Sequence, residues 1–124
     1  MFKIMAYVMA VAGCLLGLRF IFMGASVLRE WGIDVTDGSI VMSRRIGALY
    51  LGLALMFFLG RSAGPSALRS ALCLGIGVAI ALLAGLGVLE FLAERVGSRI
   101  FVSVGVETVL AAGFFAAWWS AEPR

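Results

Sequence analysis

Four long apolar stretches, separated by polar links, constrain the fold of this chain more than any other feature. A helix needs about 20 apolar residues to cross the hydrocarbon core of a bilayer, where the backbone must satisfy its own hydrogen bonds. The sequence therefore predicts an all-α fold, a bundle of four transmembrane helices. One transmembrane domain covers residues 1–124, with spans at residues 4–23, 41–60, 69–90 and 100–119.

The composition of the chain agrees with a lipid environment. Hydrophobic residues make up 63% of it and charged residues 14%, whereas ordinary soluble domains have about 45–50% and about 25%. The 10 lysines and arginines occur singly or in one adjacent pair, which is typical of anchors at the membrane interface. We therefore expect the chain to contact membrane lipids and no nucleic acid.

The residue types that most catalytic and metal sites need are missing or scattered. There is no histidine, which removes the commonest general base and metal ligand. Cys14 and Cys73 lie inside apolar stretches and have no zinc-binding spacing, so we expect them to pack as small hydrophobic side chains. The sequence predicts no catalytic residue, no metal site and no cofactor, and a protein that is not an enzyme.

Two of the apolar stretches need comment. The second is uninterrupted only over residues 46–60, and extending it to spanning length brings Arg44 and Arg45 into the membrane interface, where their long side chains can reach the headgroups. The first contains Val11-Ala12-Gly13-Cys14, which resembles a lipoprotein cleavage box. Because its apolar run continues well past that box, we expect a retained span rather than a signal peptide.

The link between the first two spans, residues 24–39, is long and polar. Ser26 is placed to cap a short interfacial helix that carries Val27 and Leu28, with Trp31 as an anchor. The pair Asp37-Gly38 predicts a turn. The other two links are short.

Small residues recur at the spacing that lets membrane helices approach closely. These predicted helix-packing residues are Gly13, Gly17 and Gly24 in the first span and its end, Gly77, Ala81 and Ala84 in the third, and Ala112 and Ala116 in the fourth. They can serve packing within the monomer or form a surface for a partner or a second copy, and the pattern does not separate the two.

Charges inside the spans are the most specific signal in the chain. At a rise of about 1.5 Å per residue, Glu107 lies about 10 Å from the start of the fourth span and Arg19 about 6 Å from the end of the first. A charge at a helix centre costs about 2.5–3.5 kcal/mol on insertion scales. Both positions belong to the membrane half away from the termini. The predicted intramembrane polar cluster comprises Arg19, Arg44, Arg45, Tyr50, Glu90, Ser103 and Glu107.

Two interpretations of this cluster remain open. Glu107 can pair with Arg19 or Arg45 and orient the helices, since buried ion pairs can fix register. Alternatively, the cluster lines a polar cavity for an ion, a proton or a lipid headgroup, because ionisable residues inside membranes are functional candidates.

Three segments carry a resemblance to a known family. They are Gly17-Leu18-Arg19-Phe20-Ile21-Phe22, Trp31-Gly32-Ile33 and Arg45-Ile46-Gly47-Ala48-Leu49-Tyr50-Leu51-Gly52-Leu53. Together they resemble a bacterial domain-of-unknown-function family of small four-helix membrane proteins. The resemblance implies the topology and a role for Arg19 and Arg45, but no activity. This chain has Gly24-Ala25 where members often carry a proline.

An even number of spans places both termini on one side of the membrane. Basic residues are nearly balanced between the two sides, and acidic residues favour the side opposite the termini. We therefore expect a bacterial inner-membrane protein with cytoplasmic termini.

Two classes of function follow from these features. The first is a non-enzymatic structural or accessory protein, working as a subunit of a membrane complex or as a homo-oligomer. The alternative is a small transporter or channel with a polar intramembrane site around Arg19 and Glu107.

Overall fold

The computed structural model describes residues 1–121, and these residues form helices and links with no strand among them. The helices are α1 (Phe2–Phe22), α2 (Gly24–Glu30), α3 (Asp37–Leu59), α4 (Ala67–Leu92) and α5 (Ile100–Ala121). All except the short α2 are long and apolar enough to cross a bilayer. The predicted all-α fold with four membrane-spanning helices is thereby confirmed.

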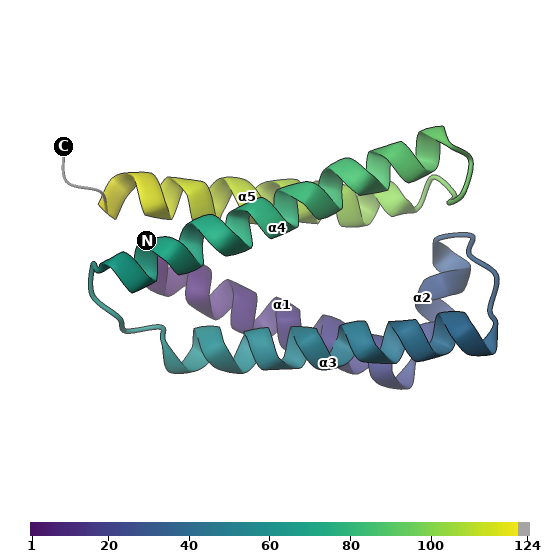
Figure 1. The fold of residues 1–124 in the computed structure, drawn as a ribbon, viewed down its shortest axis with the longest axis horizontal. Helices are drawn as coiled ribbons and strands as arrows, with labels where there is room; N and C mark the ends of the chain where they lie inside the picture. The colour runs from purple at the N-terminus through teal and green to yellow at the C-terminus, as the bar shows by residue number, and fades with distance from the viewer. Residues whose placement is uncertain (122–124) are drawn as a thin grey trace.

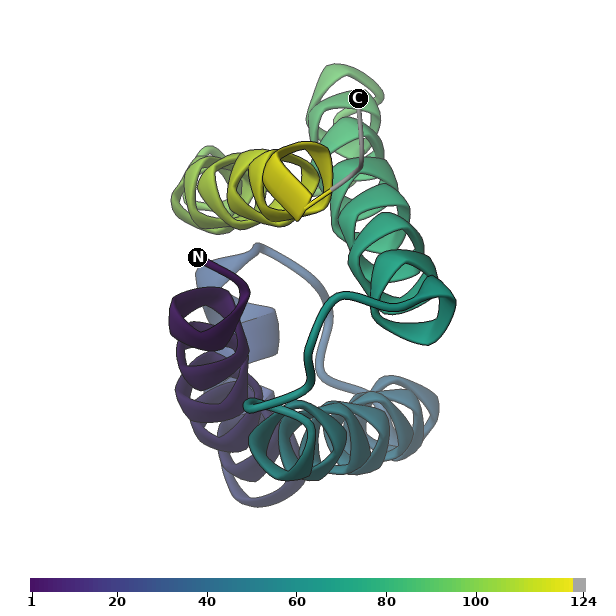
Figure 2. The same cartoon turned by 90° about the vertical axis from the view of Figure 1, so that its left-hand side faces the viewer.

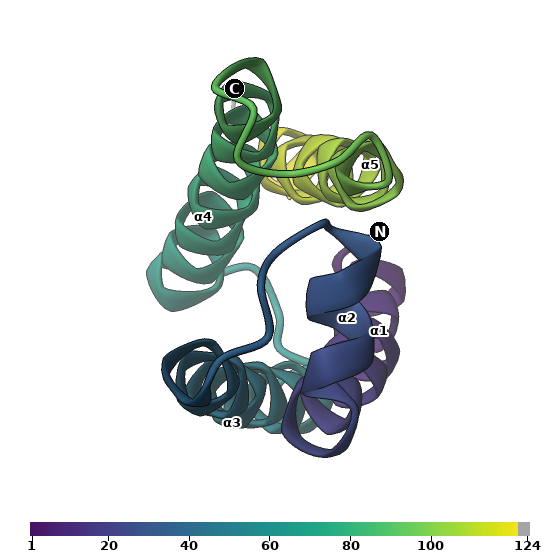
Figure 3. The same ribbon diagram turned by 90° about the vertical axis from the view of Figure 1, so that its right-hand side faces the viewer.

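The four long helices form two antiparallel pairs, one above the other (Figure 1). α1 packs along α3 and α4 packs along α5, whereas α1 and α5 make a much smaller contact between the pairs. At the end where the termini lie, α5 lies over α1 (Figure 2). At the opposite end, α2 lies beside α1 and beneath α5 (Figure 3). The two pairs therefore converge near the termini and diverge toward α2.

The buried core lies in the half of the molecule near the termini. Phe57 of α3 and Phe114 of α5 pack with ring centroids 5.3 Å apart, and both side chains are buried. The residues clustered around them come from α1, α4 and α5 and are Phe2, Ala6, Met9, Cys73, Ile76, Ile80, Ala111 and Ala117. Because all four long helices contribute, this core holds the two pairs together near the termini, and at the other end the backbone N–H of Gly97 donates to the backbone oxygen of Trp31 at 2.7 Å.

Glycines allow α1 and α3 to approach closely. A Cβ atom on Gly17 would lie 2.8 Å from the backbone oxygen of Gly47, and one on Gly47 would lie 2.7 Å from that of Gly17. A Cβ on Gly13 would lie 3.0 Å from the backbone oxygen of Tyr50. Gly13 and Gly17 therefore lie where α1 approaches the backbone of α3, and Gly47 lies opposite Gly17 across the seam.

The other predicted packing residues divide into two groups. Gly24 faces the hydroxyl of Ser43, Gly77 faces the ring of Phe115, and Ala84 is buried. In contrast, the predicted stripe on the last helix and one alanine of α4 face outward: Ala81, Ala112 and Ala116. The buried side of α5 instead carries Ala111, Phe114 and Ala117. Of the two roles left open for the small residues, packing within the monomer does not apply to these exposed alanines, and on α5 the inward face is the one toward α4 and α1.

The link between the first two spans differs from its sequence-based description. The short helix exists and buries Val27 and Leu28, but its N-cap is Met23, so Ser26 lies inside it and does not cap it. Asp37-Gly38 is not a turn but the first residues of α3. Thr36 and Ser39 form a capping box in which each side chain accepts a hydrogen bond from the other residue's backbone N–H. This cap allows the helix to begin before the apolar run.

Candidate binding cleft between the helix pairs

A cleft of about 930 Å³ separates the two helix pairs on the side toward α2. Its volume lies in the range of about 300–1,000 Å³ that is usual for small-molecule sites. Every helix contributes to its walls, and most of the lining side chains are apolar, including Met9, Leu16, Ile46, Leu83 and Val106. The cleft exists because the pairs are joined through the core near the termini, while α2 lies between their other ends.

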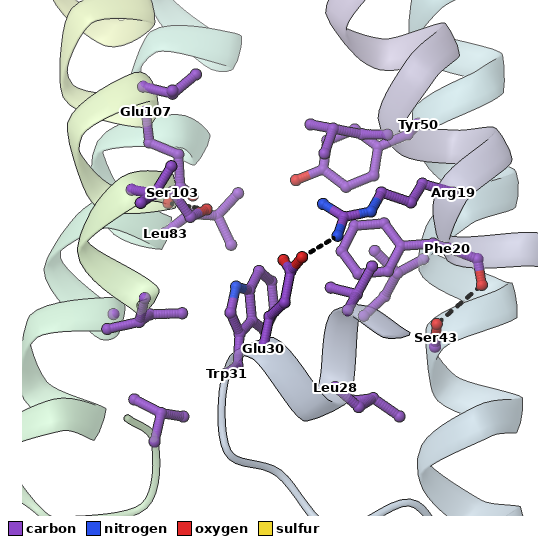
Figure 4. A pocket seen from close by; sticks show the side chains of 18 of the residues that line it. Arg19, Phe20, Leu28, Glu30, Trp31, Ser43, Tyr50, Leu83, Ser103 and Glu107 are labelled. Atoms are coloured by element: carbon purple, nitrogen blue, oxygen red, sulfur yellow. Dashed lines mark hydrogen bonds and ion pairs between the residues drawn. The ribbon is translucent and has the colours of Figure 1, made fainter. Parts of the chain in front are cut away.

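Polar side chains enter this apolar cleft from both helix pairs (Figure 4). They are Arg19, Glu30, Ser39, Ser43, Tyr50, Glu90, Arg99, Ser103 and Glu107. The cleft therefore brings together Arg19, Tyr50, Glu90, Ser103 and Glu107 from the predicted polar cluster. Their partners, however, differ from those expected.

Arg19 pairs with Glu30 and not with Glu107. Its Nη2 atom donates to Oε1 of Glu30 at 2.6 Å, and both side chains remain partly exposed to the cleft. The pair forms because α2 folds back beside the end of α1 and presents its last residue to Arg19. The structure thus corrects the expected Arg19–Glu107 pair: the two residues stand on opposite walls of the cleft.

Glu107 receives a hydrogen bond from its own helix. Ser103 Oγ donates to Glu107 Oε1 at 3.0 Å, one turn earlier on α5. Within residues 1–121, no basic side chain forms an ion pair with this carboxylate. Glu107 is half-buried and faces the opposite wall, where Tyr50 lies.

Arg44 and Arg45 do not line the cleft, which corrects their predicted membership of one cluster with Glu107. Both side chains are exposed on α3. Arg44 Nε donates to the backbone oxygen of Ile21 at 3.2 Å, so it connects α3 to the end of α1. The expected alternative pair between Glu107 and Arg45 is not formed either, since Arg45 is exposed and lies outside the cleft lining.

Glu90 reaches the cleft, but its charge is already paired. Arg95 Nε donates to Glu90 Oε2 at 2.5 Å, across the link that follows α4. This hydrogen bond raises the pKa of the exposed Arg95 guanidinium above its ordinary value. The negative charge of Glu90 is therefore balanced by Arg95 at the end of α4.

Three aromatic rings form a continuous wall of the cleft, which we call the aromatic wall: Phe20, Trp31 and Tyr50. Phe20 and Tyr50 are stacked, with centroids 5.9 Å apart and planes 8° from parallel. Phe20 and Trp31 meet edge to face, also with centroids 5.9 Å apart. The wall thus combines rings from α1, α3 and the end of α2, opposite Glu107.

Several cleft residues were not predicted from the sequence. Glu30 and Trp31 could not be placed because nothing local indicates that α2 turns back toward the cleft. Ser43 was not predicted either, but a sequence signal for it exists. It lies four residues before Gly47, and this spacing of small residues marks a contact face. Its buried hydroxyl donates to the backbone oxygen of Phe20 at 2.9 Å.

Comparison with known proteins adds no family to this description. No family model matches the chain, and no curated protein or solved structure matches it significantly. The four apolar helices define the class, an integral membrane protein. The membership suggested by the three sequence segments stays a prediction.

Proposed function

We propose that this protein is a non-enzymatic membrane protein that binds a small amphipathic molecule between its two helix pairs, as a small transporter or carrier does. The observation that carries the proposal is the cleft of about 930 Å³ with apolar walls and convergent polar groups. Apolar walls can bury the body of a ligand, while a few polar groups fix its orientation.

The order of polar and apolar groups along the cleft supports an amphipathic ligand. Arg19, Glu30 and Arg99 line the cleft toward α2, whereas Met9 and Ala12 line it deeper along α1. An amphiphile in a bilayer has the same order, with its polar end toward the interface and its apolar body inward. The cleft therefore offers such a molecule the polarity gradient that it has in the membrane.

A long-chain alcohol carrying a photoreactive diazirine tests this proposal in reconstituted vesicles. We expect adducts on Val106, which lines the cleft, to saturate with probe concentration and to be suppressed by excess unlabelled alcohol. A binding site has limited capacity, whereas general contact with dissolved probe does not saturate. Leu82 does not line the cleft and is 61% exposed, so its adducts should increase in proportion to the probe. Mass spectrometry of the labelled peptides gives both curves.

Two neighbouring variants provide the control. Leu83→Trp places a large side chain in the cleft, while Leu82→Trp makes the same change at nearly the same depth outside it. Leu83→Trp should abolish the saturable adducts on Val106, and Leu82→Trp should leave them unchanged. Adducts on Val106 that never saturate, or an equal effect of the two variants, would contradict the proposal.

The first class predicted from the sequence, an accessory subunit or homo-oligomer, has a separate observation in its favour. Ala112 and Ala116 are four residues apart on α5 and face outward, so another helix could approach there closely. Native mass spectrometry of protein released from detergent separates the two possibilities. Release of a monomer only would leave the accessory-subunit or homo-oligomer class without support.

A further inference from the structure

Among the described acidic side chains that line the cleft, Glu107 is the one that has no ion-pair partner. Arg19 and Glu30 neutralise each other, and Arg95 neutralises Glu90. Arg99 also lines the cleft, but it lies eight residues before Glu107, a separation of about 12 Å along the axis of α5. Glu107 is therefore the cleft carboxylate that no cation balances within the part of the chain described.

An unbalanced carboxylate between apolar walls is energetically unfavourable. Water is scarce there, and a charged group that lacks a partner loses its hydration without compensation. The hydroxyl of Ser103 supplies a single hydrogen bond. A positively charged ligand would supply the missing counter-charge, and this gain would be larger in the cleft than in water because the local dielectric is low.

The wall opposite Glu107 also suits a cation. The faces of aromatic rings attract positive charge, most strongly in tryptophan, and groups of rings recognise quaternary ammonium ligands. The aromatic wall and Glu107 face each other across the cleft (Figure 4). A cation between them would lie near the Glu107 carboxyl group on one side and, on the other, near the Tyr50 hydroxyl and the rings of the aromatic wall, beside the Arg19–Glu30 pair (Figure 4).

The size and the apolar lining of the cleft do not suit a small hydrated ion. No group of acidic or cysteine side chains in residues 1–121 has the arrangement needed to hold a metal ion. The cleft is far larger than an inorganic cation and mostly apolar. Its lining instead matches a cation that carries its own apolar substituents.

We propose that the ligand class is the lipophilic organic cation, whose charge is balanced by Glu107 and the aromatic wall while its apolar substituents pack against residues such as Leu83 and Val106. This inference rests on the proposed function, because it requires a ligand in the cleft. It adds to that proposal the sign of the ligand's charge and the residues that recognise this charge.

Three aryl probes of similar shape and different charge test the inference on purified protein in nanodiscs. They are tetraphenylphosphonium, the neutral triphenylphosphine oxide and the anion tetraphenylborate. The cation should bind most tightly and the anion most weakly, as measured by equilibrium binding with corrections for partition into empty nanodiscs. Glu107→Gln should weaken cation binding by about tenfold to a hundredfold, the range expected for a charge-assisted contact, and should leave binding of the neutral probe unchanged.

Control variants keep the result interpretable. Glu94→Gln removes an exposed carboxylate outside the cleft and should not alter binding of any probe. Trp31→Leu removes one ring of the aromatic wall and should weaken binding of the cation more than binding of the neutral probe. It therefore tests the inference even if Glu107→Gln does not fold. Equal binding of all three probes, or tightest binding of the anion, would overturn the cation inference while leaving the cleft as a binding site. Absence of saturable binding by any probe would overturn the proposed function itself.

Discussion

Arg19 lies in the last turn of a membrane-spanning helix and finds its partner eleven residues later, on a short helix that turns back beside it. Without Glu30, its guanidinium would face an apolar cleft. The two side chains are 37% and 39% exposed, so their interaction is weakened relative to a fully buried pair. The pair attaches α2 to α1 and leaves Glu107 available on the opposite wall.

A double-mutant cycle tests this assignment at the level of residues. Arg19→Leu and Glu30→Gln should each lower the stability of the protein in detergent, and the double variant should show a coupling energy of about 0.5–1 kcal/mol, typical of partly exposed pairs. Arg19→Leu combined with Glu107→Gln should be additive within error, because these side chains do not touch. Unfolding in a denaturing detergent series measures all six proteins: the wild type, the three single variants and the two double variants. Coupling of Arg19 to Glu107 instead of Glu30 would refute the assignment.

At the scale of the elements, the long helices were predictable and the short one only in part. Apolar length identifies a span directly, since the bilayer sets the length of helix that it requires. The start of α3 was missed because Asp37-Gly38 resembles a turn, whereas the capping box of Thr36 and Ser39 determines the outcome. The return of α2 depends on a contact between segments distant in sequence, which no local pattern records.

The packing faces of the helices were predictable to different degrees. The α1 face followed from its G-x-x-x-G spacing, because glycine marks sites where backbones approach. The α5 face did not, since alanines occur on several of its sides and, up to residue 120, only Ala111 and Ala117 turn inward with Phe114. The polar residues of the candidate site could be found as intramembrane charges, but their pairing required the positions of all the helices.

Two glycines of α3 give a matched test of the α1–α3 seam. A Cβ on Gly47 would lie 2.7 Å from a backbone oxygen of α1, whereas a Cβ on Gly52 would have nothing within 4 Å. Gly47→Ala should therefore lower the free energy of unfolding by about 1–3 kcal/mol, as overpacking does. Gly52→Ala should leave it unchanged or raise it by up to about 1 kcal/mol, because alanine favours helix. Equal effects of the two substitutions would mean that the helices do not meet at Gly47.

For the whole molecule, the uneven distribution of contacts has a functional consequence. The core near the termini joins all four long helices, while the cleft occupies the other half. In the proposed function, a ligand therefore occupies the cleft without disrupting the core. The molecule is thus divided into a packed half near the termini and a half that holds the cleft.

The three tryptophans make occupancy of the cleft directly measurable. Trp31 lines the cleft, whereas Trp118 and Trp119 lie together near the end of α5, at the other end of the molecule. A variant with Trp118→Phe and Trp119→Phe reports from the cleft alone, and Trp31→Phe reports from the other two residues. Titration of vesicles containing each variant with a brominated long-chain alcohol, which quenches tryptophan fluorescence on contact, compares the two locations. We predict saturable quenching of Trp31 and a linear, unsaturable response of Trp118 and Trp119; the same linear response at both locations would contradict the claim that the cleft is a binding site.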